Sequence, residues 1–447
     1  MSTAEGTGQQ AGRIAIRVWA LMIGVLFMGM GNGLQWTLLG IRAIDENFSS
    51  TVTGITATGY FIGIFLAARV VPDFLKNVGH VRVFAAAASM ASIAILIQSV
   101  FIEPWVWMLM RGISGFSFAG LYIVSESWLN EEADNQSRGQ LLGIYMVVQL
   151  FGMGTGQILI NFSDTDAFDL FILVSVLISI SLVPMALTKV AQPAVPQTGS
   201  LKLKELISIS PFGALGAFMS GMGVATVMGM GAVYGAVVGM SVSQIALFVG
   251  AVILGPVLLQ WPLGRLSDIF DRRLVIIMSC FLAGGMALAC HFVFPVTGAL
   301  SLIGILIVGG SVVSLYSLFL AYLTDFVDKS MIVPLCGMYI AVNGAGAIFA
   351  PILAGYALDV VGGGGFWFLI AIIHIFLGSY GLYRMTQRAP LPSEEQAPFT
   401  MVASSTLPLA SEWSEEVYDY VPETTDDDDE EDVIVGKPKQ TPEPDAT

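Results

Sequence analysis

Charged residues are scarce in this chain of 447 residues: Asp, Glu, Lys and Arg together make up 12%. A soluble globular protein carries roughly twice that share, about 25%. So little polar surface argues strongly against a soluble enzyme of this size. Hydrophobic residues make up 55%, and a helical membrane span takes about 20 apolar residues. The chain is therefore long enough for about a dozen spans.

Several chemical signatures are also missing. There is no Gly-x-x-x-x-Gly-Lys-Ser/Thr loop, no His-Glu-x-x-His and no Gly-x-Ser-x-Gly motif, which argues against ATP hydrolysis and intramembrane proteolysis. The sequence has no cluster of basic residues that would indicate binding of a nucleic acid. The three cysteines, Cys280, Cys290 and Cys336, lie in apolar stretches and are predicted to be buried, neither disulfide-bonded nor ligating a metal. We expect no enzymatic activity, no cofactor and no metal.

The net charge of −15 comes from one end of the chain. Residues 387–447 contain 16 acidic and 3 basic residues, and residues 426–432 are all acidic. This Pro-rich segment has too few apolar residues to fold alone, so it is predicted to be disordered. Residues 411–423 mix aromatic with acidic side chains and suggest a docking segment for a cytoplasmic protein.

Hydropathy divides the remainder into twelve candidate helices. Their approximate ranges are 17–40, 51–71, 83–102, 105–128, 139–162, 168–188, 212–239, 243–263, 274–294, 298–322, 334–358 and 365–386. The first is too long for a signal-peptide core and is interpreted as a retained signal anchor.

The connections predict the domain organisation and the orientation. The chain is predicted to begin with a cytoplasmic segment, 1–16, followed by a six-helix bundle, 17–188. A linker rich in Pro, Gly and Ser, 189–211, then leads to a second six-helix bundle, 212–386, and to the acidic tail, 387–447. With the N-terminus inside, most Lys and Arg of the short connections fall on the cytoplasmic side, as the positive-inside rule requires. Both termini are thus predicted to be cytoplasmic, in the cell membrane.

The two bundles repeat in sequence. A shift of 194 residues pairs Tyr122 with Tyr316 and Gln149 with Asn343. The same shift pairs further Gly, Leu, Tyr and acidic positions between residues 115 and 152 and their counterparts, without a gap. Six spans separate the copies, so both cross the bilayer in the same direction. The predicted fold is an all-α membrane protein with twelve transmembrane helices in two parallel six-helix repeats, an architecture used by transporters that rock two bundles about a central site.

One loop motif carries a family resemblance. The sequence GRLSDIFDRR resembles the loop signature of the major facilitator superfamily, matching it at Gly264, Asp268, Arg272 and Arg273. In the first half, Gly79 fits the same signature, whereas Pro72 and Lys76 replace its first Gly and its Asp. The segments VGHVRVF and SESWLNEEADNQSRG resemble the YcaD-like branch. The resemblance, over about residues 15–386, implies this fold and a conformational role for the loop residues.

Two charged residues lie in the fourth span. An Arg at the depth of Arg111 costs several kcal/mol unless it is paired or hydrated, and Arg111 with Gly115 resembles the family's Arg-x-x-x-Gly motif, which is linked to proton coupling. Alternatively, Arg111 bonds helix carbonyls or reaches outward. Glu126 lies within about 60° of Arg111 around the helix but about 22 Å along it, so the two cannot pair. Glu126 is a candidate proton site, or a charge at the helix end.

Amide and aromatic side chains complete the candidate solute and proton pathway, either as solute-binding groups or as hydrogen bonds between helices. They are Asn32, Gln35, Trp36, Tyr122, Gln149, Gln157, Tyr316, Tyr339 and Asn343.

The sequence thus favours a secondary active transporter, a symporter or antiporter. It is expected to be monomeric and to move a small solute, with protons, by alternating access. Arg111, without a carboxylate at its depth in the same helix, favours an organic anion. A non-transporting sensor or scaffold that signals through the tail, and a multidrug or lipid exporter, remain alternatives.

Overall fold

The computed structural model describes residues 2–132, 138–187, 201–328 and 331–387. The helices of the first half are α1 (Ser2–Asp45), α2 (Ser50–Val78), α3 (His80–Val100), α4 (Pro104–Glu132), α5 (Arg138–Leu159), the 3₁₀ turn η1 (Ile160–Phe162) and α6 (Asp169–Ala186). Those of the second half are α7 (Leu203–Ile209), α8 (Pro211–Val237), α9 (Val242–Ile269), α10 (Arg272–Phe292), α11 (Ala299–Thr324), α12 (Ile332–Val361) and α13 (Gly364–Met385).

Twelve helices within these ranges are long and apolar enough to cross a bilayer, all except α7 and η1. The predicted all-α fold with twelve spans is therefore confirmed. The acidic tail and most of the predicted linker lie outside the described residues, apart from the linker segment that forms α7. The three cysteines are buried, and none of them forms a disulfide within the described residues.

The helix ends differ from the hydropathy prediction where charged residues continue a helix. The second span, predicted to end at residue 71, continues through Pro72 and Lys76 to Val78. It stops at Gly79, whose φ of 84° favours glycine and whose N–H donates to the Leu75 carbonyl oxygen at 3.1 Å. Hydropathy ends a span at the edge of its apolar stretch, whereas the backbone hydrogen bonds end it where glycine allows the chain to turn.

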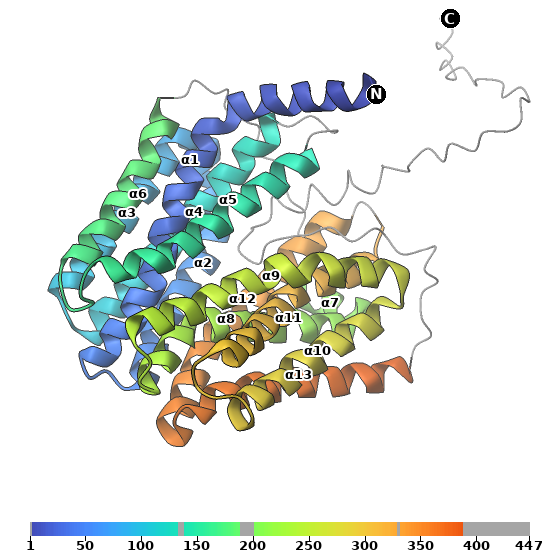
Figure 1. Cartoon of the computed structure of the whole chain (residues 1–447). Coiled ribbons are helices and arrows are strands. Elements are labelled where there is room, and N and C mark those ends of the chain that lie inside the picture. Colours follow the sequence, from blue (N-terminus) through green and yellow to red (C-terminus); the bar gives the residue numbers. More distant parts are fainter. Residues whose placement is uncertain (1, 133–137, 188–200, 329–330, 388–447) are drawn as a thin grey trace, which may run out of the picture.

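The helices form two bundles, α1–α6 and α8–α13, with equivalent internal packing (Figure 1). Helix α2 packs on α4 as α9 packs on α11, and α1 packs on α5 as α8 packs on α12. Likewise, α3 contacts α6 as α10 contacts α13. The predicted parallel repeat is thus present in the structure. Between the bundles, α2 contacts α12, α1 contacts α8 and α5 contacts α9.

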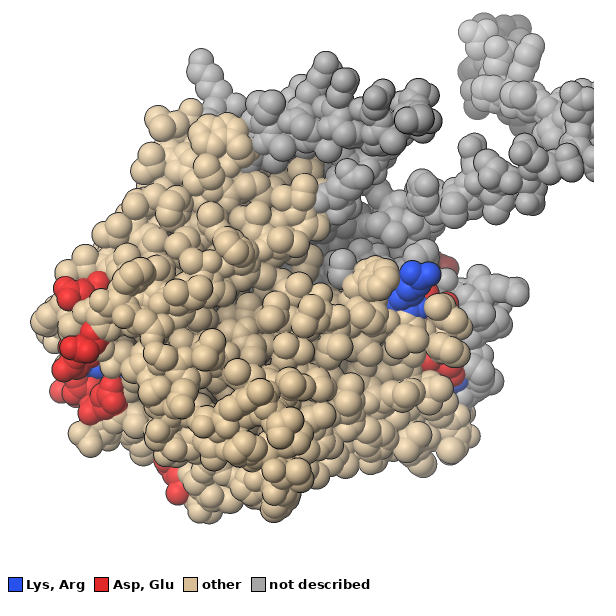
Figure 2. Space-filling view, in the orientation of Figure 1, with Lys and Arg blue, Asp and Glu red and all other residues tan. Residues whose placement is uncertain are grey.

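Charged residues gather at the ends of the bundles. Figure 2 shows acidic residues at one end of the visible face and a broad band without charge beside them. By the helix order, the loops after α1, α3, α5, α8, α10 and α12 lie at one end, which we call the acidic end because Asp45, Asp164 and Asp166 are exposed in these loops. The opposite end, from which residues 187 and 201 lead into the linker, is the linker end.

Glycines allow neighbouring helices to approach backbone to backbone. A Cβ atom added to Gly152 of α5 would lie 2.6 Å from the Leu26 carbonyl oxygen of α1. Its repeat mate Gly346 of α12 meets the Phe218 backbone of α8 in the same way. Because lipid tails are as apolar as leucine, such close packing supplies much of the force that holds helices together in a bilayer.

This packing predicts different effects for two glycines of α5. Gly152→Ala should lower the melting temperature of the purified protein by a few degrees, because overpacking costs on the order of 1–3 kcal/mol. Gly154→Ala is the control, since an added Cβ there has nothing within 4 Å and alanine favours the helix. Equal melting temperatures for the two variants, measured by thermal unfolding in detergent, would contradict the assignment of Gly152 to the helix contact.

Candidate functional site

A cavity of about 460 Å³ lies between the two bundles. Helices α1, α2, α4 and α5 line it from the first bundle, and α8, α9, α11 and α12 line it from the second. It extends along α2 from Tyr60 to Arg69 and along α12 from Ala347 back to Pro334, and Leu201 of the linker region also lines it. These positions run from the middle of the spans towards the linker end.

The acidic end of the same interface is closed by hydrogen bonds between the bundles. The Asp359 carboxylate of α12 accepts from the backbone N–H groups of Ser50 and Thr51, both at 2.8 Å, and from the Thr51 hydroxyl at 2.6 Å. These groups form the N-terminus of α2, where the helix dipole favours a negative charge. Nearby, the Ser243 hydroxyl donates to Asn161 at 2.6 Å. Polar contacts therefore join the bundles at this end.

The helices α2 and α12 also approach each other without intervening side chains. A Cβ on Gly54 would collide with the Pro351 carbonyl group, and one on Gly355 would collide with that of Ser50. Farther in, the Thr58 hydroxyl donates to the Ile348 carbonyl oxygen at 2.9 Å. The structure is consequently shut at the acidic end and hollow towards the linker end.

Arg111 of α4 is 3% exposed and lies inside the first bundle. The carbon at the centre of its guanidinium group lies 4.1 Å from the ring centre of Trp36 and 4.5 Å from that of Tyr60. No acidic side chain within the described ranges forms an ion pair with it. Cation–π contacts in a desolvated site contribute about 2 kcal/mol. Trp36 and Tyr60 line the cavity but Arg111 does not, so the two rings separate it from the space.

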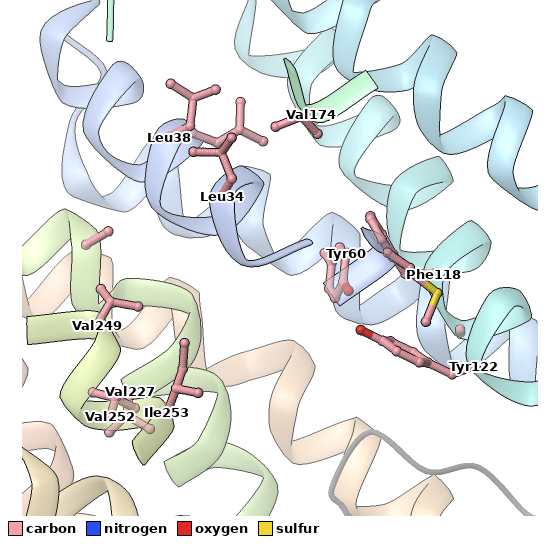
Figure 3. Close-up of a cluster of buried hydrophobic side chains, with 14 of the residues drawn as sticks. Leu34, Leu38, Tyr60, Phe118, Tyr122, Val174, Val227, Val249, Val252 and Ile253 are labelled. Atoms are coloured by element: carbon pink, nitrogen blue, oxygen red, sulfur yellow. The ribbon is translucent and has the colours of Figure 1, made fainter. Parts of the chain in front are cut away.

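A hydrogen-bond network surrounds Tyr122 of α4. Asn32 donates to the Tyr122 hydroxyl at 3.0 Å and accepts from the Tyr60 hydroxyl at 3.3 Å, and Gln149 also hydrogen-bonds to Tyr122. Tyr60 and Tyr122 lie close together in the first bundle (Figure 3). All four residues line the cavity. Helices α1, α2, α4 and α5 are therefore joined at the cavity wall.

Glu126 is completely buried one turn beyond Tyr122 on α4. The Tyr145 hydroxyl of α5 donates to its carboxyl group at 3.2 Å. A burial this complete is unlike the exposed helix-end charge that was the alternative interpretation.

Other predicted amides bind neighbouring helices. Gln35 donates to Ser114 at 3.2 Å. Gln157 accepts from Thr37 at 2.5 Å and donates to the Gly33 carbonyl oxygen at 2.9 Å. Gln157 still lines the cavity, whereas Gln35 does not. For these two amides the geometry favours a role in holding helices together.

The second bundle places Tyr316 and Asn343 on the opposite wall of the cavity. The Asn343 amide nitrogen donates to the Ala217 carbonyl oxygen and to the Ser220 hydroxyl, both at 3.0 Å. Tyr339 lies behind them, and its hydroxyl donates to the Tyr316 carbonyl oxygen at 2.7 Å.

The loop motif forms a buried ion pair at the linker end. The Arg272 guanidinium group, 1% exposed, donates to both oxygens of Asp325 at 2.7 Å, to Asp268 at 3.1 Å and to the Ala321 carbonyl oxygen at 3.1 Å. It thereby ties α9, α10 and α11 together. Arg273 bonds Asp271, which also caps the N-terminus of α10. Gly264 is buried in α9.

The first-half copy of this motif is different. Gly79 provides the turn, as described above, and the buried His80 follows it, with its Nε2 2.8 Å from the Ser127 hydroxyl. With the motif aligned on Pro72 and Gly264, His80 occupies the place of Arg272, and Ser127 is the repeat mate of Ala321. A neutral hydrogen bond thus stands where the second half has an arginine, as expected from the divergent first-half motif.

Most predicted pathway residues meet at one cavity. Those that line it are Asn32, Trp36, Tyr122, Gln149, Gln157, Tyr316 and Asn343, while Gln35, Arg111, Glu126 and Tyr339 lie behind the wall. Sequence reasoning missed Tyr60, Gln260 and the closing Asp359. The signal for Asp359 is an isolated acidic residue directly after the eleventh predicted span, 334–358, but nothing in the sequence singles out Tyr60.

These observations define a class: two homologous six-helix bundles around one central cavity, closed at one end, are the architecture of a membrane carrier. Residues 21–331 and 213–417 match the Major Facilitator Superfamily. The chain belongs to this family and is a multi-pass membrane transporter.

Relatives confirm the resemblance to the YcaD-like branch. The chain is 26% identical over 281 residues to the uncharacterized MFS-type transporter YcaD of Escherichia fergusonii, covering 61% of this chain and 73% of that protein. It is 23% identical over 341 residues to YcaD of Salmonella newport, covering 75% and 87%.

Solved structures share the fold at low sequence identity. The nucleoside transporter NupG has a TM-score of 0.70 at 12% identity, covering 83% of this chain and 99% of NupG. A bacterial homolog to the human lysosomal transporter Spinster, in an inward-facing and occupied conformation, has a TM-score of 0.67 at 12% identity, covering 85% and 97%. At this identity the likeness extends to the fold alone.

The closure at the acidic end predicts a shift in conformation when Asp359 is changed. Asp359→Ala removes three hydrogen bonds between the bundles, and a loss of about 1 kcal/mol would raise the ratio of open to closed molecules about fivefold. Spin labels at Asp166→Cys and Thr297→Cys, one exposed position in each bundle at this end, should show more of the longer distance. Asp45→Ala is the control, because Asp45 bonds Thr165 within one bundle. Unchanged distances in Asp359→Ala would exclude this role.

Proposed function

We propose that this transporter is a secondary active carrier, without enzymatic activity, that moves a small solute by alternating access. The observation that supports this proposal is the cavity between the repeated bundles, which is shut at one end by Asp359 and the glycine contacts and extends towards the other. Rocking the bundles about the central site would open the acidic end and close the linker end. We further propose that it works as a monomer, since one chain supplies both walls.

The orientation proposed from the sequence gives the cavity a side. Lys and Arg concentrate in the connections at the linker end, which the positive-inside rule places in the cytoplasm. In that orientation both termini are cytoplasmic, and the cavity extends towards the cytoplasm. The acidic tail, with its proposed docking segment for a cytoplasmic protein, lies outside the described residues.

We propose that proton movement is coupled to transport through Glu126. A carboxyl group buried completely inside a membrane bundle is costly when charged, so a change of protonation there changes the balance of interactions around it. Tyr122, one turn before Glu126 on α4, and Tyr316 of α11 line the cavity from opposite bundles. A change of protonation at Glu126 therefore acts one turn from Tyr122, a side chain that lines the cavity, and in this way would couple solute binding to proton movement in a symporter or an antiporter.

Glu126→Gln should uncouple transport from the proton gradient. Proteoliposomes would carry a solute that a thermal-shift screen of metabolites identifies as a ligand. The variant should exchange labelled for unlabelled solute across the membrane but fail to accumulate it against a gradient, because the amide does not titrate. Glu103→Gln, at the exposed acidic end of α4, is the control and should accumulate normally. Accumulation by Glu126→Gln at the wild-type level would refute the coupling role.

An organic anion is one candidate for the solute, and the position of Arg111 is the observation that favours it. Its guanidinium group lacks an ion-pair partner within the described residues and lies against Trp36 and Tyr60, which line the cavity. A rotation of either ring would bring the charge to the cavity wall. A carboxylate could then form a charge-assisted pair with it.

This candidate predicts how carboxylate ligands respond to Arg111 variants. Arg111→Gln should weaken the binding of carboxylates by about 10- to 100-fold, because a hydrogen bond to a charged group contributes about 1.5–3 kcal/mol. Arg111→Lys retains the charge and should preserve part of the affinity. Binding of a carboxylate series would be measured by calorimetry on purified protein. Equal affinities in wild type and Arg111→Gln would eliminate the anion candidate.

A further inference from the structure

The cavity wall is almost without charge, which restricts the solute. Among the described residues that line it, Arg69 is the one charged side chain, and no Asp or Glu takes part. Arg69 lies towards the linker end of the cavity, with its guanidinium carbon 3.9 Å from the ring centre of Phe65 and a hydrogen bond to the Phe65 carbonyl oxygen at 3.4 Å. In the central part of the cavity, a charged solute would lose water without gaining an opposite charge, which is costly.

Aromatic and methionine side chains supply much of the remaining wall. The Trp36 ring centre lies 4.6 Å from that of Tyr60 and 5.8 Å from that of Phe61, in edge and tilted arrangements. Met153 and Met228 face the same space from α5 and α8. An aromatic ring gains additional energy against other rings at such distances. Methionine is flexible enough to fit varied outlines and also contacts rings favourably.

The repeat relates the pair Tyr122 and Gln149 to the pair Tyr316 and Asn343. The two pairs differ in how many of their hydrogen-bonding groups are bonded within the protein. In the first bundle, Tyr122 bonds both Asn32 and Gln149. In the second bundle, both hydrogen bonds of Asn343 use its nitrogen. Within the described part of the chain, no hydrogen bond engages the Asn343 side-chain oxygen or the Tyr316 hydroxyl. This second pair can still accept from and donate to a solute.

We propose that the solute is an uncharged, largely apolar compound with an aromatic ring and at least one hydrogen-bonding group. Its ring lies against Trp36, Tyr60 and Phe61, and its polar group bonds Asn343 and Tyr316. This inference rests on the proposed function, in that the cavity is taken to be the solute site.

Three probes of matched size separate the possible solute classes. Full-length protein in nanodiscs would be titrated at neutral pH with 2-naphthol, which is uncharged, 2-naphthoate, an anion, and 2-naphthylmethylammonium, a cation. Dissociation constants come from equilibrium dialysis, with empty nanodiscs subtracted for partition into lipid. We expect 2-naphthol to bind at least tenfold more tightly than either charged probe. Tighter binding of a charged probe, equal binding of all three, or no binding overturns the inference.

Variants locate the bound probe. Tyr316→Phe removes one hydroxyl and should weaken 2-naphthol about fivefold, since a neutral hydrogen bond contributes about 1 kcal/mol. Tyr356→Phe, at a side chain 62% exposed on the outside of α12, should not. Trp36→Leu should weaken binding, whereas Trp261→Leu, at a side chain 58% exposed, should not. Unchanged binding in both Tyr316→Phe and Trp36→Leu, with unchanged melting temperatures, overturns the assigned position.

The outcome is independent of the coupling mechanism. Binding is measured without a membrane gradient, so the solute class can be wrong while Glu126→Gln still uncouples transport of another solute. Conversely, 2-naphthol can bind as expected to a protein whose Glu126→Gln variant accumulates solute normally, and then the coupling proposal alone fails.

Discussion

The contact between the start of α2 and the end of α12 is the interaction on which the rest of the structure depends. Each bundle is held together internally by close helix packing, but the bundles themselves meet along few helices. The glycines at positions 54 and 355 let two backbones touch, and the Asp359 carboxylate completes the N-terminus of the opposing helix. Because these contacts lie at one end, the bundles diverge towards the other, and the cavity is the space left by that divergence. A carboxylate that bonds exposed backbone groups is a reversible connection, since water can replace it when the bundles part.

Polar groups buried inside the spans are constrained differently from polar groups at the ends of the helices. In a bilayer, an unsatisfied amide or charge is expensive, so most amides facing the cavity are already bonded to another helix. This explains why Gln157, which lines the cavity, is bonded to α1. Arg111 is the extreme case, because aromatic faces take the place of a counter-charge. Tyr316 and Asn343 retain hydrogen-bonding capacity after this internal demand is met, which is why we propose that they bind the polar group of the solute.

Much of the fold could be predicted from the sequence because membrane spans and repeats are properties of the chain itself. Twelve apolar stretches, the pairing of Tyr122 with Tyr316 and the loop motif led directly to the observed architecture. The site was harder to predict, because which partner a buried side chain finds depends on the rotation of each helix about its axis. The sequence predicted that Trp36 contacts the solute. It did not predict that the rings of Trp36 and Tyr60 shield Arg111, because this depends on how α1, α2 and α4 pack. The role of Asp359 likewise needs the second bundle, more than 300 residues away in sequence, to be placed against α2.

The differences between the two repeats are as informative as their likeness. The shift of 194 residues places Ile305 opposite Arg111 and Leu320 opposite Glu126, so both charged residues of the fourth span are absent from its repeat mate. The second half has its own charged cluster instead, the Arg272–Asp325 pair at the linker end. A perfectly symmetric carrier would respond to protonation equally in both bundles, and the change would favour neither open state. With the proton site proposed at Glu126, the titratable group belongs to one bundle only, so that a single proton would alter how that bundle sits against the other.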